Sequence, residues 1–259
     1  MKCLYCLKEK QKSEFSREHI IPQQLGKFDF PTIQICRECN TNFSNEFENF
    51  ISNFSTIKKI VNGEVGVDTI NDSIEEFSQN VMNQKFILKI CFNFLYLLLP
   101  NSIFYDLNKS AFNSINLMRN LIYGRITFGN DNIKILIPTN LNISNFKEQY
   151  NIAISNNAID KSGNRHLEIQ FDLCNCFTIK FPLNIITTND IFAYIFTFKK
   201  EDIRGNVEIF DFQKGIIIKW NNKVKRELQE ELSKRIIIND DIKNWGVGNA
   251  NWIVEDWKL

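Results

Sequence analysis

The sequence has little net charge, few histidines and no apolar segment long enough to cross a membrane. Its 31 basic and 30 acidic residues leave a formal charge of +1, so the overall balance does not attract nucleic acid or anionic membranes as a strongly basic chain would. Any contact with nucleic acid must therefore come from a local patch. The most apolar run, residues 86–99, has 14 residues, whereas a spanning helix needs about 20. We expect this run to form a buried helix.

The N-terminus also lacks a targeting signal, because it opens with cysteines and charges rather than with a basic and then an apolar region. We therefore expect a cytoplasmic protein with no membrane partner. Charged residues make up 24% of the chain and apolar residues 44%, a composition typical of packed domains that excludes wholesale disorder. The length of 259 residues suits one core or a small head with a separate body.

Four of the seven cysteines form two Cys-x-x-Cys pairs. These pairs are Cys3/Cys6 and Cys36/Cys39. In a reducing compartment such pairs indicate a zinc site rather than disulfides, and each pair can fill two corners of a tetrahedron. Zinc held by four thiolates has no open position, so it would stabilise the fold while any catalysis took place elsewhere. We interpret Cys91, Cys174 and Cys176 as small apolar residues.

The chain divides into two predicted domains, residues 1–66 and residues 67–259. The first contains both cysteine pairs and, after Asn40, a helix predicted from apolar residues at helical spacing that ends near residues 62–63. Those apolar residues are Phe43, Phe47, Phe50, Ile51 and Phe54. We expect the second domain to be of the α+β class, with helices first and a mainly antiparallel sheet afterwards.

In the second domain, a helical pattern begins at Asn71 or Asp72 and stops at Pro100, and a further helix over residues 111–123 closes at Gly124. A final helix is predicted over residues 223–235. Between these helices, short β-rich runs alternate with turn residues, which favours an antiparallel meander. The runs are residues 125–128, 133–137, 166–171, 177–181, 191–198, 207–210 and 216–220.

A second motif lies between and just after the cysteine pairs. It consists of Glu18-His19-Ile-Ile-Pro with Leu25-Gly26 behind it, and of Asn40 directly after the second pair. At this point the sequence resembles the HNH endonuclease family, specifically the group in which a four-cysteine zinc site braces a small ββα-metal module. The resemblance is confined to the first domain, and nothing in residues 67–259 matches a motif.

The resemblance implies that Glu18 and Asn40 hold one catalytic divalent ion and that His19 is the general base. Successive side chains of a strand point to opposite sides, so Glu18 can reach a metal while His19 faces substrate. One carboxylate and one amide oxygen suit Mg²⁺ or Mn²⁺, which would polarise the scissile phosphate as His19 takes a proton from water. Asn40 is also suited to cap the helix that follows. His166, the other histidine, is interpreted as structural.

The sequence departs from the family pattern at Pro31, where the family has its middle asparagine. Thr32, Gln34 or a backbone carbonyl would have to order the loop of the base instead, or the enzyme would be slow. Asn45 and Glu48, in the helix after Asn40, are candidates for a further ligand or a water-mediated contact. Three basic residues near the site are candidates for gripping phosphates: Arg17, Lys27 and Arg37.

The sequence thus predicts an HNH endonuclease that hydrolyses DNA, with RNA a less favoured substrate. The second domain would target or restrain the first, through a protein or small-molecule regulator, as in an effector of phage defence. The alternative is a zinc-ribbon module that binds nucleic acid or protein and whose catalytic site has lapsed, which the proline at position 31 makes conceivable. An intact trio of Glu18, His19 and Asn40 argues against that alternative. Sequence specificity and oligomeric state remain open.

Overall fold

The computed structural model describes residues 1–49, 80–105, 113–125, 134–136, 149–173, 177–199 and 205–237. Its N-terminal module is a two-stranded ribbon followed by a helix. Strands β1 (Phe15–His19) and β2 (Thr32–Cys36) pair antiparallel, and α1 (Arg37–Phe43) begins directly after β2. Two short 3₁₀ turns, η1 (Lys12–Glu14) and η2 (Gln23–Leu25), flank β1. The predicted ββα order of the module is therefore confirmed.

Helix α1 passes at Phe43 into a turn of π-helix, η3 (Ser44–Glu48). Phe43 and Phe47 are buried, as their spacing of four predicts, and they anchor this segment in the core. A π-turn is rare and often occurs at functional sites, and nothing in the sequence pattern indicated it. The other three predicted core residues of this helix, and its expected end near residues 62–63, lie outside the described residues.

Helix α5 (Val81–Leu98) is the predicted buried helix. The side chain of Asn80 accepts a hydrogen bond from the backbone of Met82 at 2.8 Å and caps its first turn, and Pro100 follows its end. By length and composition α5 could cross a membrane, but 78% of it is buried inside the protein, as in a core helix. The predicted start at Asn71 or Asp72 lies outside the described residues.

Two shorter helices follow, α6 (Ser102–Tyr105) and α7 (Asn113–Ile122). Helix α7 is the predicted one, and it closes at Gly124, whose φ of +72° is a conformation that glycine adopts without strain. The last helix, α8 (Asn222–Arg235), is capped by Asn221. It buries Val224, Leu228 and Leu232, so the expected amphipathic helix is present.

In the part of the chain that the structure describes, the sheet has seven antiparallel strands in the order β3-β6-β5-β4-β7-β8-β9. Their bounds are β3 (Lys134–Leu136), β4 (Gln149–Ile159), β5 (Arg165–Leu173), β6 (Phe177–Ile186), β7 (Ala193–Lys199), β8 (Asn206–Asp211) and β9 (Ile216–Lys219). The expected antiparallel sheet is confirmed. Its strands do not follow one another as one meander, because β4-β5-β6 and β7-β8-β9 are two meanders joined where β7 pairs with β4. The sequence analysis missed β4, the central strand, and the strand predicted at residues 125–128 lies mostly outside the described residues.

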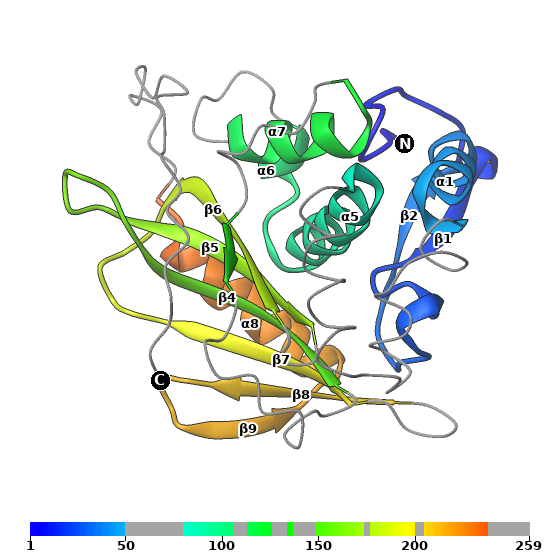
Figure 1. Ribbon diagram of the computed structural model, residues 1–259. Coiled ribbons are helices and arrows are strands. Elements are labelled where there is room, and N and C mark those ends of the chain that lie inside the picture. The colour runs from blue at the N-terminus through cyan, green and yellow to red at the C-terminus, as the bar shows by residue number, and fades with distance from the viewer. Residues whose placement is uncertain are drawn as a thin grey trace.

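Helix α5 lies between the N-terminal module and the sheet (Figure 1). On one side the hydroxyl of Tyr5 donates to the side-chain oxygen of Asn93 at 2.5 Å. On the other side Phe94 packs edge-to-face on Phe196 of β7, with ring centroids 4.6 Å apart. The buried residues of module, helices and sheet form one cluster, so the two predicted domains share a core, while the boundary expected near residue 66 lies outside the described residues.

Candidate metal and catalytic site

The four cysteines of the two pairs come together at one end of the module. The sulfur of Cys3 lies 3.9 Å from that of Cys39, and the sulfur of Cys6 lies 3.8 Å from that of Cys36. All four ligand atoms lie within 4.8 Å of one another, and all four residues are buried. Sulfurs bound about 2.3 Å from a zinc ion form a tetrahedron with edges of about 3.8 Å. The cluster therefore fits zinc, as the sequence predicted.

Local backbone structure explains how the pairs form. The first pair lies in a turn in which Leu7 has a φ of 62° and donates its backbone N–H to the carbonyl of Cys3 at 3.1 Å. The second pair spans the junction of β2 and α1, where Cys36 is the N-cap residue and Cys39 lies in the first turn. A metal here would fix the direction in which α1 leaves the ribbon.

The ribbon separates Glu18 from His19. The register pairs Arg17 with Gln34 and His19 with Thr32, and these four residues are exposed, so they form the outer face of the ribbon. Glu18 points inward and is only 7% exposed. The division expected from strand geometry, with one residue inward and its neighbour outward, is thus what the module has.

Glu18 meets a second carboxylate and a lysine beneath the ribbon. The ammonium of Lys89, in α5, makes ion pairs with both Glu18 and Glu48, and Glu48 is the last residue of the π-turn. The same ammonium lies 5.6 Å from the centre of the Phe43 ring. Burial raises the pKa of Glu18, Lys89 opposes this rise and the nearby Glu48 carboxylate adds to it.

Asn40 faces the same inner side of the ribbon from the first helix. Its amide nitrogen donates to the hydroxyl of Ser16 at 3.1 Å, and Ser16 lies two residues before Glu18 on β1. This bond turns the amide so that its oxygen is the atom left to act as a ligand. Asn40 therefore contacts the same strand as Glu18, at the residue two positions before it.

The residues of the inner side fit a cation by charge, because two buried carboxylates already converge on one positive group. Carboxylate and amide oxygens are the ligands that Mg²⁺ and Mn²⁺ prefer. Glu18 and Asn40 would hold such an ion, with Glu48 near enough to Glu18 that both contact one ammonium. The ion would polarise a phosphate and stabilise the leaving oxygen.

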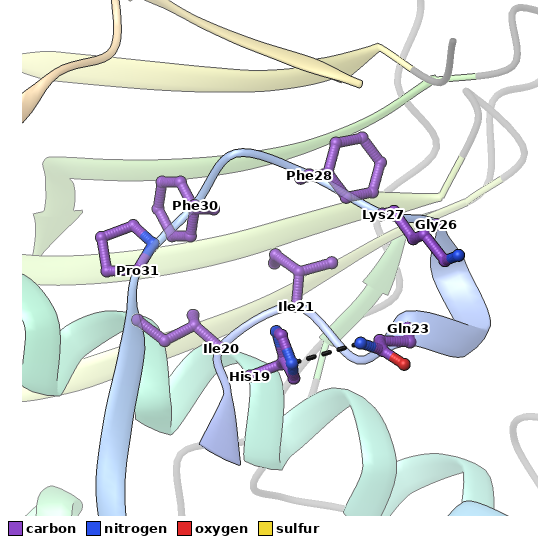
Figure 2. Close-up of a pocket in the computed structure, with 9 residues that line it drawn as sticks. All are labelled: His19, Ile20, Ile21, Gln23, Gly26, Lys27, Phe28, Phe30 and Pro31. Atoms are coloured by element: carbon purple, nitrogen blue, oxygen red, sulfur yellow. Dashed lines mark hydrogen bonds between the residues drawn. The ribbon is translucent and has the colours of Figure 1, made fainter. Parts of the chain in front are cut away.

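His19 lines a cavity of about 210 Å³. The nine lining residues run from His19, the last residue of β1, to Pro31 in the loop that connects β1 to β2. Figure 2 shows His19 and Gln23 side by side, and their side-chain nitrogens are 3.2 Å apart. One of the two histidine nitrogens is therefore engaged by Gln23, which orients the ring.

The same loop attaches the site to the sheet. Phe28 packs edge-to-face on Tyr150 and Phe198, and Phe30 contacts Phe94 and Trp220. Pro31 lines the cavity and precedes Thr32, the cross-strand neighbour of His19. The family's middle asparagine, which would order this loop, is replaced here by Pro31. Aromatic packing and the contact of Gln23 with His19 hold the loop instead.

The three basic residues singled out in the sequence are exposed, and they occupy different places. Arg17 lies on the outer face of the ribbon with His19, and Lys27 lines the cavity. Arg37 is the first residue of α1. Arg17 and Lys27 thus lie on the His19 side of the module.

Sequence reasoning missed Lys89 and Gln23 and gave Glu48 little weight. Lys89 lies in an apolar run, 41 residues beyond Glu48. A charged residue in such a run was the available signal, because a buried lysine needs a partner. The side-chain bond of Gln23 to His19, four residues earlier, carried no signal of its own.

Residues 3–55 match the family model described as HNH endonuclease. No curated protein and no solved structure matches the chain. The match begins at the first cysteine of the zinc cluster and covers the ribbon, the helix and the π-turn on which Glu18, His19, Asn40 and Glu48 lie. Residues 3–55 are therefore similar to an HNH endonuclease module, and the helix α5 and the sheet lie outside the match.

Proposed function

We propose that the protein is a metal-dependent endonuclease that hydrolyses phosphodiester bonds in DNA. The observation that carries this proposal is the placement of Glu18 and His19, adjacent in sequence, on opposite sides of a zinc-braced ribbon. One side offers oxygen ligands and the other offers an exposed imidazole beside a cavity and two basic residues. The reaction requires the ion and the base to reach one phosphodiester, the ion through a phosphate oxygen and the base through the attacking water, which neighbouring residues at the end of β1 can do.

In the proposed reaction His19 accepts a proton from the attacking water through Nε2, the ring nitrogen to which the Gln23 amide donates in this structure, and the water takes the place of that amide. Arg17 and Lys27 bind phosphates that flank the scissile bond, and Arg37 is a third candidate for this role. The four cysteines brace the ribbon against α1, so that Asn40 is held opposite Glu18. The second part of the chain, in this proposal, controls the module, and a role in phage defence is one setting in which a controlled nuclease is useful.

The ion pair of Lys89 with Glu18 favours a second candidate function. If Lys89 permanently neutralises the inner carboxylates, the module is a lapsed nuclease that binds nucleic acid or protein through its outer face. Such a protein would bind plasmid and would not cut it under any divalent ion.

The test uses the full-length protein and supercoiled plasmid with Mg²⁺ or Mn²⁺. We expect conversion to open circles, and we expect the His19→Ala variant to lose at least a hundredfold in rate, within the usual contribution of a general base of about 10²–10⁴. Zinc content and thermal unfolding should not change in this variant, because His19 is exposed.

The His19→Ala protein, purified in parallel, is also the control for contaminating nucleases. Equal nicking by the two proteins would refute the assigned base, and plasmid binding without cleavage by either would support the lapsed module. A parallel assay on structured RNA separates the substrates, since cleavage of RNA alone would contradict the DNA assignment and leave the nuclease assignment intact.

A further inference from the structure

Three elements far apart in sequence converge on one buried positive charge. Glu18 comes from β1, Glu48 from the π-turn η3, and Lys89 from α5. Their exposed fractions are 7%, 9% and 1%. Glutamates and lysines are seldom buried to this extent, so the contact between module and body holds a charge cluster where apolar packing would be expected.

The cluster brings two carboxylates to one cation. Both glutamates pair with the same ammonium, so a metal ion in the place of that ammonium would meet an oxygen of each. A buried ion pair repays the cost of its desolvation only with good geometry and further hydrogen bonds. A divalent cation carries the charge of two carboxylates, and oxygen ligands of this kind are those that Mg²⁺ and Mn²⁺ take.

We propose that Glu18 and Glu48 together form the divalent-cation site of this module, and that the Lys89 ammonium is an internal cation that occupies it until the ion displaces it. Glu48 is then a second carboxylate ligand, and α5 controls access of the metal to the nuclease module. This inference rests on the proposed function for its consequence in catalysis, but its binding test does not require activity.

The neighbouring turn of the same helix provides a matched comparison. Lys85 lies one turn before Lys89 on α5 and pairs with Glu46, two residues before Glu48. This pair joins the same two elements with the same residue types. The side chain of Glu46 is 37% exposed, and within the described residues it makes no ion pair with the ribbon. Changing Lys85 therefore alters the contact between α5 and η3 without removing a charge from Glu18.

The first experiment measures Mn²⁺ binding to full-length protein by titration calorimetry, with zinc retained, and compares Lys89→Met with Lys85→Met. Removing the competing ammonium should raise Mn²⁺ affinity at least tenfold and should increase the rise in melting temperature on adding Mn²⁺. The Lys85→Met protein should bind Mn²⁺ as the unchanged protein does. Equal Mn²⁺ affinities for all three proteins would overturn the proposal.

The second experiment uses Glu48→Gln, which leaves the Lys89 pair with Glu18 in place and protects the test if Lys89→Met fails to fold. If Glu48 is a ligand, this change should lower Mn²⁺ affinity at least tenfold, although it also loosens the hold on Lys89. If Glu48 only anchors Lys89, affinity should stay equal or rise, and that result would refute the site. Glu46→Gln is the control and should leave affinity unchanged.

Nicking measured on the same proteins separates the two proposals. Under the internal-cation proposal, Lys89→Met should require at least tenfold less Mn²⁺ for half-maximal nicking. If nicking depends on His19 but Lys89→Met needs as much Mn²⁺ as the unchanged protein, the internal-cation proposal is refuted and the nuclease proposal stands. Tighter Mn²⁺ binding by Lys89→Met with no cleavage by any protein would refute the nuclease and keep the cation site.

Discussion

At the scale of single residues, the module is joined to the rest of the chain by polar contacts that are buried. The ring of Tyr5 packs on Phe43 and Phe92, and its hydroxyl bonds to Asn93 of α5. The amide nitrogen of Asn93 is buried with no hydrogen-bond partner among the described residues. Among the described residues, the Tyr5 hydroxyl is therefore the hydrogen-bond partner of this buried side-chain amide.

We expect Tyr5→Phe to lower the free energy of unfolding by about 1–3 kcal/mol, because it leaves the Asn93 side chain without that partner. The ring packing would remain. Chemical denaturation followed by circular dichroism measures the change. The Tyr5→Phe/Asn93→Leu double variant should recover part of the loss, and an unchanged stability of Tyr5→Phe would show that the bond contributes nothing.

Much of the site could be predicted from residues close together in sequence. The sequence spacing is enough to recognise three features: the two cysteine pairs, the acidic residue before the histidine, and the asparagine after the second pair. The alternation of side chains along a strand was enough to place Glu18 and His19 on opposite sides. Lys89 could not be foreseen in its role, because its contact with Glu18 depends on how α5 packs against the module. That packing is a long-range property that no local pattern encodes.

At the scale of elements, the cysteine cluster fixes a junction. It ties the N-terminal turn to the point where β2 becomes α1, and so it sets the distance between Ser16 on the ribbon and Asn40 on the helix. Cysteine pairing predicted this brace, whereas the central strand β4 escaped prediction. Its run of asparagine and serine, at positions 155–157, has low β-propensity, and it coincides with an irregularity where the register with β5 shifts between Ser155 and Ala158.

Cys36→Ser should reduce zinc from about one ion per chain to a small fraction, because a structural site needs all four ligands. The melting temperature should fall with it. Metal analysis of protein purified without added zinc provides the measurement. Cys91→Ala is the matched control, since Cys91 is also buried but lies in α5 away from the cluster, and it should keep its zinc. Full zinc retention by Cys36→Ser would contradict the assignment.

At the scale of the whole molecule, the connecting loop of the module is attached to the sheet by its backbone as well as by its rings. Gly205 donates its N–H to the carbonyl of Lys27 at 2.7 Å, and Phe28 forms a parallel bridge with Gly205. A Cβ atom at Gly205 would lie 2.4 Å from the carbonyl oxygen of Lys199 and 2.6 Å from the ring of Phe28. Only glycine permits this approach.

Gly205→Ala should therefore lower the free energy of unfolding by about 2–4 kcal/mol, as backbone or ring must shift to relieve the overlap. Thermal unfolding gives the measurement. Gly163→Ala is the control, because a Cβ there meets nothing within 4 Å and only the positive φ costs energy, about 1 kcal/mol. A loss at Gly205 no larger than that at Gly163 would mean that the loop is not held against the sheet.

The π-turn gives this site a dependence on chain length that is separate from its dependence on side chains. A π-turn closes its hydrogen bonds from i to i+5 instead of i to i+4, so it takes up one residue more than an α-helical turn while the residues on either side keep nearly the same relative orientation. The interval of eight positions between Asn40 and Glu48 therefore belongs with the π-turn η3. A related chain that is one residue shorter here should place its glutamate as this chain does only if the segment is a regular α-helix, so the interval and the helix type together identify chains that share the two-carboxylate arrangement.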